Sequence, residues 1–169
     1  IFITSLSKSI SPALRVGYLL APPNFVERLV STLHAITLAN SQLVFEVAST
    51  MIMNGATDDV ISKNFIDLKR RHETARLKLP EAKMHQNPAA FFSWLELPEH
   101  WNAHDFSQAL RTAGVSVVPA DNFAVGDQLP PRAVRVALTP APNLKALETG
   151  LDIVKHVLEG FPRPKMAVV

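Results

Sequence analysis

Apolar side chains in the first third of the chain recur mostly at helical spacing. Over residues 25–36 they return every three or four positions after Pro22-Pro23, and proline suits the first turn of a helix. A second helical segment covers residues 42–53 and ends at Asn54-Gly55, a pair typical of a helix end. Residues 15–20 are β-branched and aromatic enough to predict a strand before both helices.

The next segment, residues 57–79, has the pattern of a long amphipathic helix. Its apolar positions recur at spacings of three and four, Thr57 can cap its start, and Pro80 stops it. The densest basic cluster of the chain lies here, with acidic residues mixed in. We expect these basic side chains to face solvent, with contact to DNA as the alternative; they are Lys69, Arg70, Arg71 and Arg76.

The remaining chain predicts a module in the order β-α-β-β-α. Strands are expected over residues 91–98, 115–119 and 133–138, with a loop between the last two. A short helix over residues 105–113 ends before Gly114, which suits the residue after a helix. The last helix, residues 143–159, carries an apolar stripe made of Leu144, Leu147, Leu151, Val154 and Leu158.

This order of elements predicts an α/β chain that contains a small α+β domain. The expected boundaries are residues 1–56 for a first part, 57–79 for a long connecting helix, 80–162 for the small domain and 163–169 for a tail. The chain begins with Ile and its candidate chemistry follows at once. We therefore expect it to be the C-terminal part of a longer protein.

Composition narrows the function classes. The 169 residues carry 17 basic and 15 acidic side chains, a formal net charge of +2, which is too small a surplus to indicate nucleic-acid binding by itself. No apolar run reaches the roughly 18 residues of a membrane span, and no secretion signal is present. We expect a soluble, cytoplasmic chain without a membrane partner. The lack of cysteine excludes disulfides, thiolate metal sites and a cysteine nucleophile.

The stretch SLSK, residues 5–8, allows two chemical interpretations. Ser5 and Lys8 fit the pattern S-x-x-K, in which a lysine activates a serine nucleophile. The further elements S-D-N and K-T-G that accompany this pattern in penicillin-recognising enzymes are missing. Acyl transfer by Ser5 is therefore the weaker interpretation.

The second interpretation treats Lys8 as an amine that condenses with an aldehyde cofactor to an imine. Such a cofactor usually carries a phosphate, which needs hydroxyl groups and a permanently charged, two-pronged donor nearby. Ser5, Ser7 and Arg15 are residues of the right types, and Gly17 suits a chain that turns back past the lysine.

Residues 5–18, SLSKSISPALRVGY, closely resemble the pyridoxal-phosphate lysine segment of class I aminotransferases of fold type I. The resemblance continues through three later segments that look like the small domain of that fold: AAFFSWLELPE, GVSVVPADNFAVG and AVRVALTPAPNLKALETGLDIV. More narrowly, NGATDD with LKRRHETAR, WLELPEHW and PADNFAVG resembles the effector domain of MocR-type regulators of the GntR family.

The resemblance implies roles for single residues. Lys8 would be the imine-forming lysine, and Ser5 and Arg15 would hold the phosphate of pyridoxal 5'-phosphate. Arg135 matches the small-domain arginine that binds the α-carboxylate of an amino acid, and a guanidinium fits a carboxylate at two points; from the residues alone, a salt bridge at an edge strand is equally compatible. Residues 1–56 would be the end of the cofactor-binding large domain.

Three functions remain open. The leading hypothesis is the effector domain of a MocR-type regulator, whose DNA contact belongs to an N-terminal winged helix outside this chain and whose ligand is amino-acid-like. A free-standing aminotransferase would use the same residues. An interaction module without a ligand would leave Lys8 and Arg15 as ordinary surface charges. The resemblance also implies a homodimer for the intact protein, with other site residues before the lysine. We therefore expect this chain alone to be weakly active or inactive.

His100 and His104 stand four residues apart, a spacing that two metal ligands can share. Pro98 favours a loop at this point, and no third ligand has a matching spacing. We expect no metal site.

Three aromatic residues are expected to pack the small domain or shape its pocket. Trp94 and Trp101 are candidates for packing. Phe123 lies in the loop before Arg135, where it can line a substrate pocket or anchor the loop.

Overall fold

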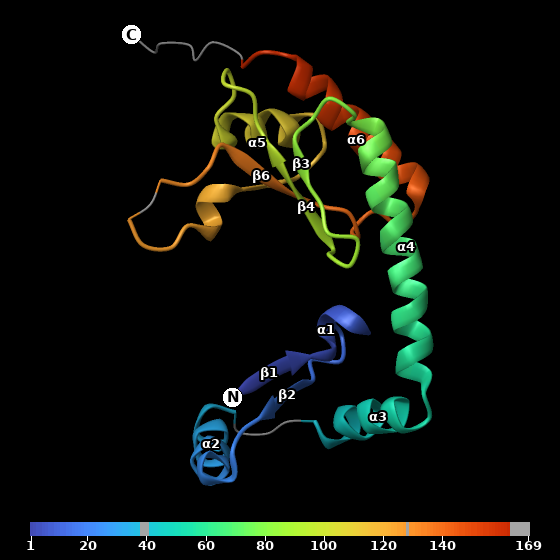
Figure 1. Ribbon diagram of the computed structural model, residues 1–169, viewed down its shortest axis with the longest axis vertical. Helices are drawn as coiled ribbons and strands as arrows, with labels where there is room; N and C mark the ends of the chain where they lie inside the picture. The colour runs from blue at the N-terminus through green and yellow to red at the C-terminus, as the bar shows by residue number, and fades with distance from the viewer. Residues whose placement is uncertain (38–40, 128, 163–169) are drawn as a thin grey trace. The chain divides into compact units, whose positions relative to one another are not determined.

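The computed structural model describes residues 1–37, 41–127 and 129–162 (Figure 1). The chain divides into two compact units, which we call unit 1 (residues 1–64) and unit 2 (residues 65–169). The predicted tail, residues 163–169, lies outside the described residues.

Unit 1 begins with a two-stranded antiparallel hairpin. Strand β1 (Phe2–Ser5) pairs with β2 (Gly17–Leu20), and the short helix α1 (Leu6–Ser9) follows β1 directly. The predicted strand over residues 15–20 starts two residues late, because Arg15 has a left-handed backbone with φ of 52° that a strand does not accept. The sequence analysis did not predict β1.

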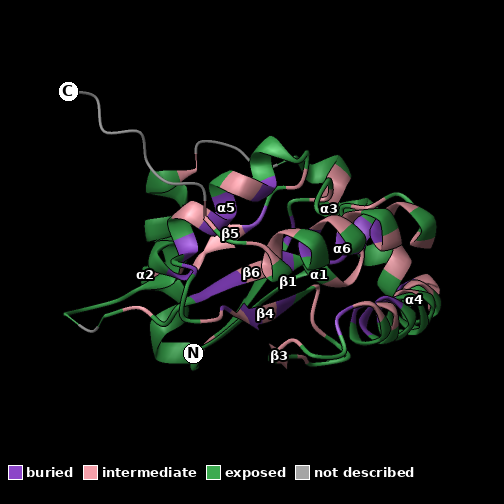
Figure 2. Cartoon of the chain, turned by 90° about the horizontal axis from the view of Figure 1, so that it is seen from above, coloured by how far each residue is buried: buried purple, intermediate pink, exposed green. Residues whose placement is uncertain are grey.

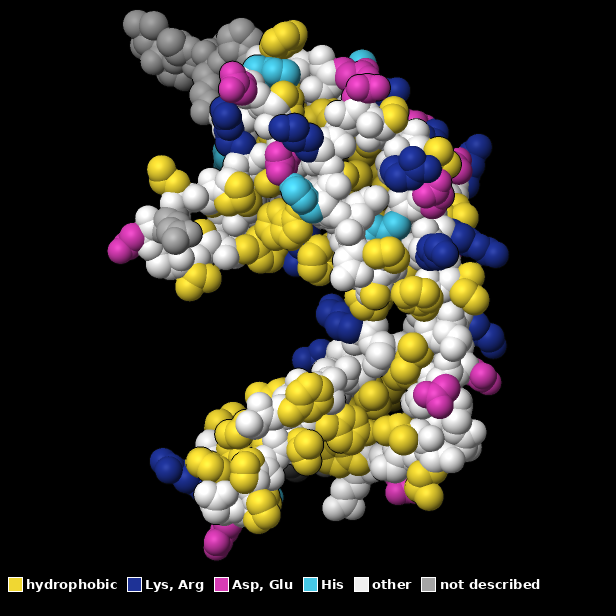
Figure 3. Space-filling view, in the orientation of Figure 1, with side chains coloured by type: hydrophobic (Ala, Val, Ile, Leu, Met, Phe, Trp, Pro, Cys, Tyr) yellow, Lys and Arg dark blue, Asp and Glu magenta, His cyan; other side chains and the backbone are white. Residues whose placement is uncertain are grey.

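Two helices complete most of unit 1. Helix α2 (Pro23–Ile36) begins at the predicted proline and α3 (Gln42–Met53) has the predicted bounds, so both predictions are confirmed. Their apolar positions are largely exposed, and apolar side chains cover much of the visible surface of this unit (Figure 3). Among the described residues of unit 1, the hydrophobic side chains that are buried are Val16 and Ala48.

The long helix α4 (Ala56–Lys78) matches the predicted segment, but its start differs from the prediction. Asn54 Oδ1 accepts a hydrogen bond from the Ala56 backbone N–H at 3.0 Å, and Gly55 has φ of 78°. Thr57 therefore lies inside the first turn, where it is buried, and the prediction that it caps the helix is wrong. An asparagine can supply the capping oxygen as well as a threonine does.

The expectation that Arg71 faces solvent is also wrong. Its side chain is buried: Nη1 donates to the carbonyls of Leu138 at 2.8 Å and Ala141 at 2.9 Å, and Nε donates to Asp67 at 2.6 Å. A buried arginine is stable only when its donors find acceptors, and these three acceptors meet that need. The neighbouring Arg70 is exposed, as predicted.

Unit 2 is built on a four-stranded antiparallel sheet of order β3-β4-β6-β5 (Figure 1). Its strands are β3 (Met84–His85), β4 (Phe92–Glu96), β5 (Val118–Pro119) and β6 (Ala133–Ala137). The predicted strand over residues 115–119 is confirmed for its last two residues. Strand β3 was not predicted, and the predicted loop before β6 contains a 3-10 turn, η1 (Ala120–Phe123).

Helices α5 (Ala103–Thr112) and α6 (Leu144–Glu159) pack on the same face of this sheet (Figure 2). The side chains of Asn102 and Asn143 cap their starts by accepting backbone hydrogen bonds, which explains why α5 begins before the predicted residue. After α5, Gly114 has φ of 90°, the conformation predicted for it.

The hydrophobic core lies between the helices and one face of the sheet. Leu95 on β4 and Val134 and Val136 on β6 point into it, and the α6 stripe meets them from the other side. Because side chains alternate along a strand, the residues between these point to the opposite face, which we call the outer face. It carries Phe92, Trp94 and Glu96 from β4, His85 from β3, Val118 from β5 and Arg135 from β6.

Within the described residues, no helix is both long enough and apolar enough to cross a membrane.

Candidate functional site

The predicted lysine segment forms a loop that is closed at its base. Ser5 at the end of β1 stands opposite Gly17 at the start of β2. The Leu6 backbone N–H donates to the Val16 carbonyl at 3.0 Å, and Ser5 Oγ donates to the same carbonyl at 3.2 Å. These contacts join the two ends of residues 5–16, so Ser5, Ser7, Lys8 and Arg15 belong to one compact element, called here the lysine loop.

Two hydroxyl-bearing residues organise the start of the lysine loop. Ser5 Oγ also accepts a hydrogen bond from the Ser7 backbone N–H at 3.1 Å, and this contact caps α1. Helix α1 then carries Lys8 one turn further on. The serine at position 5 therefore has a structural role in this loop whatever else it binds.

Lys8 is exposed, and among the described residues its amine has no hydrogen-bond or ion-pair partner. On the other side of the loop, Arg15 is exposed and has the only positive φ of a described residue other than glycine. Val16 beside it is buried and anchors the loop to unit 1. The lysine loop thus places a buried anchor directly after an exposed arginine.

One contact of this loop comes from a residue that the sequence analysis missed. Asn64 on α4 donates from Nδ2 to the carbonyl of Ser9 at 3.1 Å and so ties the end of α1 to the long helix. An asparagine within a polar helical segment gives no sequence signal for such a contact. Only the fold of unit 1 reveals it.

Arg135, the fifth predicted site residue, lies in unit 2 on the outer face of the sheet. It stands on β6 between Trp94 of β4 and Val118 of β5, so it is on an interior strand and not at the sheet edge. Its Nε atom is buried and lacks a hydrogen-bond partner. Among the described residues, none of the ion pairs includes Arg135. The alternative of a structural salt bridge therefore has no support.

Two aromatic rings, rather than an acidic side chain, lie beside the guanidinium of Arg135. Its Cζ atom lies 4.7 Å from the ring centre of Phe123 and 5.4 Å from that of Phe92. Trp94 packs edge-on against Phe123, with ring centres 5.3 Å apart. Phe123 was predicted to line a pocket or to anchor the loop and Trp94 to pack the small domain, whereas Phe92 had no predicted role.

The acidic residue on the same face is already engaged. Glu96 forms an ion pair with His85 of β3, and this hydrogen bond holds the pKa of Glu96 below its ordinary value. A carboxylate that is occupied by the neighbouring strand does not neutralise Arg135. The outer face thus presents an arginine whose charge is open to an anion.

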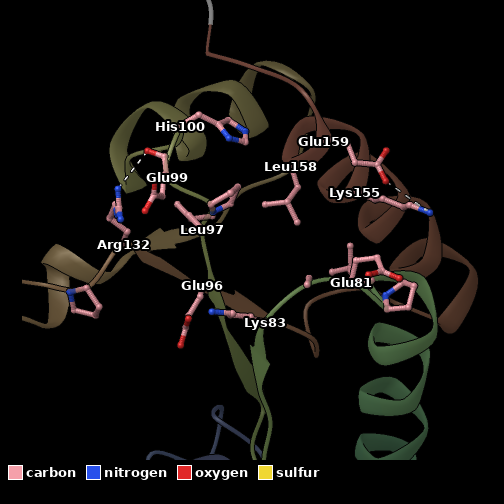
Figure 4. A pocket seen from close by; sticks show the side chains of 15 residues that line it. Glu81, Lys83, Glu96, Leu97, Glu99, His100, Arg132, Lys155, Leu158 and Glu159 are labelled. Atoms are coloured by element: carbon pink, nitrogen blue, oxygen red, sulfur yellow. Dashed lines mark hydrogen bonds and ion pairs between the residues drawn. The ribbon is translucent and has the colours of Figure 1, made fainter.

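Unit 2 also contains a cavity of about 820 Å³ at the C-terminal ends of α4 and α6 (Figure 4). Acidic and basic side chains mix along its wall, among them Lys83, Glu96, Glu99 and Arg132. None of the five predicted site residues lines it. Its charges balance each other closely enough that they favour no single ligand chemistry.

The two histidines that were weighed as metal ligands serve other contacts or stand apart. His100 Nε2 lies 3.0 Å from the carbonyl of Gly160, the same oxygen that accepts from Trp101 Nε1. Trp101 is buried, which confirms its predicted packing role. Across the described part of the chain, no group of three or more His, Cys, Asp or Glu side chains is placed to hold a metal ion.

Comparison with known protein families identifies the family of this chain. Residues 1–154 match the family described as aminotransferase class I and II. The chain belongs to this family. The predicted resemblance and the predicted fold class, the fold type I aminotransferase-like fold, are confirmed.

Curated relatives include two regulators. The chain is 30% identical over 159 residues to the uncharacterized HTH-type transcriptional regulator YdeF of Bacillus subtilis, covering 94% of this chain and 34% of that protein. It is 29% identical over 138 residues to the similarly described YdcR of Escherichia coli, covering 73% of this chain and 27% of that protein. The chain thus spans about a third of the length of the curated relatives it matches.

Solved aminotransferase structures have the same fold. The multiple substrate aminotransferase of Thermococcus profundus superimposes with a TM-score of 0.81 at 20% identity, over 92% of this chain and 40% of that one. The kynurenine aminotransferase of Pyrococcus horikoshii, solved with PMP, gives 0.82 at 17% identity, over 92% of this chain and 39% of that one. At these identities the similarity establishes the fold alone.

Proposed function

We propose that this chain is the pyridoxal-phosphate-binding, aminotransferase-like effector domain of a GntR/MocR-type transcriptional regulator, with Lys8 as the lysine that bonds covalently to the cofactor. The observation that carries the proposal is the closed lysine loop, which gathers an unpartnered amine, two serines and an arginine in one element. Similarity to two proteins described as HTH-type regulators supports the regulatory part.

The residues of the lysine loop fit this cofactor chemically. Pyridoxal phosphate, when bound, supplies an aldehyde that reacts with amines and a ring that draws electrons from the attached carbon. A primary amine without an acidic neighbour is free to act as the nucleophile. Serine hydroxyls and a guanidinium are the donors that a phosphate group needs, so Ser5, Ser7 and Arg15 would hold that end.

Arg135 has the complementary role in this proposal. It would bind the carboxylate of an amino-acid-like ligand, because a buried donor without a partner gains a hydrogen bond when the ligand arrives. DNA contact belongs to a winged-helix domain outside the 169 residues. The intact protein acts as a cytoplasmic homodimer, as expected from the resemblance.

The experiment uses the intact protein that contains this chain. It is titrated with pyridoxal phosphate, reduced with borohydride and digested, and the labelled peptide is identified by mass spectrometry. The label is expected on Lys8 and is lost in Lys8→Ala. Lys63→Ala, which removes the other lysine of unit 1, serves as the matched control and retains the label. A label on any lysine other than Lys8 contradicts the proposal.

A free-standing aminotransferase is the second candidate, and one observation favours it: the open carboxylate-binding arginine is what a transaminating enzyme needs for its substrates. The chain is also 25% identical over 129 residues to aromatic-amino-acid aminotransferase 1 of Thermococcus litoralis. Incubating the intact protein, loaded with pyridoxal phosphate and not reduced, with amino acids and 2-oxo acids separates the candidates. Catalytic turnover indicates the enzyme, and a ligand-dependent change in DNA affinity without turnover indicates the regulator.

A further inference from the structure

The guanidinium of Arg135 is held by rings from two separate elements. Phe92 stands on β4, and Phe123 lies at the end of the 3-10 turn η1, which follows β5. Both rings lie within the distance at which a cation is attracted to an aromatic face, about 6 Å. The arginine is therefore fixed from two directions without losing its charge.

This way of holding an arginine differs from an ion pair in its consequence for binding. A carboxylate partner would orient the guanidinium but would also compete with an incoming anion for the same donors. An aromatic ring orients it through the ring face and leaves the N–H donors unpaired. The unpartnered Nε of Arg135 is in agreement with this arrangement.

Phe123 is in turn supported by Trp94. The two rings meet edge to face, at an angle of 81° between their planes. Trp94 is also the direct neighbour of Arg135 across the β4–β6 ladder. Without Trp94, the ring of Phe123, which is 40% exposed at the start of a long loop, would lack a fixed position.

We propose that Phe92 and Phe123 are positioning residues that orient Arg135 for a ligand carboxylate, with Trp94 holding Phe123 in place. This inference rests on the proposed function, in which Arg135 binds the carboxylate. It predicts that removing a ring weakens binding of the carboxylate specifically, although neither phenylalanine offers a hydrogen bond to it.

The test compares ligands that differ only in the carboxylate. The intact, cofactor-loaded protein is titrated with L-alanine and ethylamine, and with L-phenylalanine and 2-phenylethylamine, while the visible cofactor band is followed. Phe123→Leu and Phe92→Leu are each expected to weaken the amino acids about tenfold relative to the matching amines, the size expected for one partly desolvated cation–π contact. Phe123→Tyr, which keeps the ring, should restore the affinity.

Controls separate this inference from the function on which it rests. Val125→Ala changes an exposed residue of the same loop and should leave all four affinities unchanged. Arg135→Ala should abolish the preference for amino acids over amines. If Arg135→Ala leaves the preference intact, or neither amino acid shifts the band of the unchanged protein, the proposed function fails and the inference with it. If only Arg135→Ala reduces the preference and the ring variants do not, the positioning role alone is overturned.

Discussion

The Nη1 atom of Arg71 donates a hydrogen bond to the carbonyl of Leu138 at 2.8 Å. Leu138 directly follows β6, and its side chain is fully buried. The contact joins residues that are 67 positions apart and fastens α4 to the end of the strand that carries Arg135. A second contact, between Ser93 Oγ on β4 and His72 Nδ1 at 3.3 Å, also joins α4 to the sheet of unit 2.

We expect Arg71→Met to lower the free energy of unfolding by about 3 kcal/mol, because hydrogen bonds from a charged group are lost and buried carbonyls remain without donors. Arg70→Met, at the exposed neighbouring position, is the control and should change it little. Urea unfolding followed by tryptophan fluorescence measures both, since both tryptophans lie in unit 2. Equal effects of the two substitutions would contradict the anchoring role of Arg71.

Two substitutions at Arg15 test separately how its backbone conformation affects stability and how its guanidinium affects cofactor binding. The left-handed φ of 52° costs a residue with a side chain roughly 1 kcal/mol, and glycine adopts it without this cost. Arg15→Gly should therefore be more stable than Arg15→Ala by about that amount. Both variants should lose affinity for pyridoxal phosphate alike, because both lack the guanidinium.

Thermal unfolding and cofactor titration of the intact protein measure these two effects independently. If the alanine and glycine variants are equally stable, the strain at position 15 does not affect stability. If either variant binds the cofactor as well as the unchanged protein does, Arg15 does not hold the phosphate.

The His85–Glu96 pair makes a pH-dependent contribution to stability. The hydrogen bond from His85 lowers the pKa of Glu96 in the folded protein relative to the unfolded chain. A lowered carboxyl pKa stabilises the fold above the unfolded value, about 4.3, and this contribution is lost as the pH falls through the lower folded value.

Glu96→Gln should therefore be less stable than the unchanged protein near pH 5, and the difference should close as the pH falls well below about 4. Glu81→Gln is the control, because Glu81 has no hydrogen-bond or ion-pair partner within the described residues. Unfolding midpoints measured across this pH range give the comparison. A difference that persists at the lowest pH would have another cause than the ionised pair.

Much of the fold could be predicted because its signals are local. Periodic apolar residues with prolines or caps at their ends predicted α2, α3 and α6 to within a residue or two. The glycine after α5 predicted its own conformation, since a left-handed residue there suits glycine best. Strands β1 and β3 were not predicted from the sequence.

The candidate site, like the fold, could be predicted only where its signals are local in the sequence. The order of serines, lysine and arginine in residues 5–15 is a property of the sequence, and it was enough to suggest the cofactor chemistry and the family. The sequence did not show that Asn64 secures α1, that Arg71 is buried, or that two phenylalanines flank Arg135. Apart from Arg71–Asp67 and Arg135–Phe123, these contacts join residues that are 43 or more positions apart. They therefore depend on sheet register and helix packing, which only the tertiary structure decides.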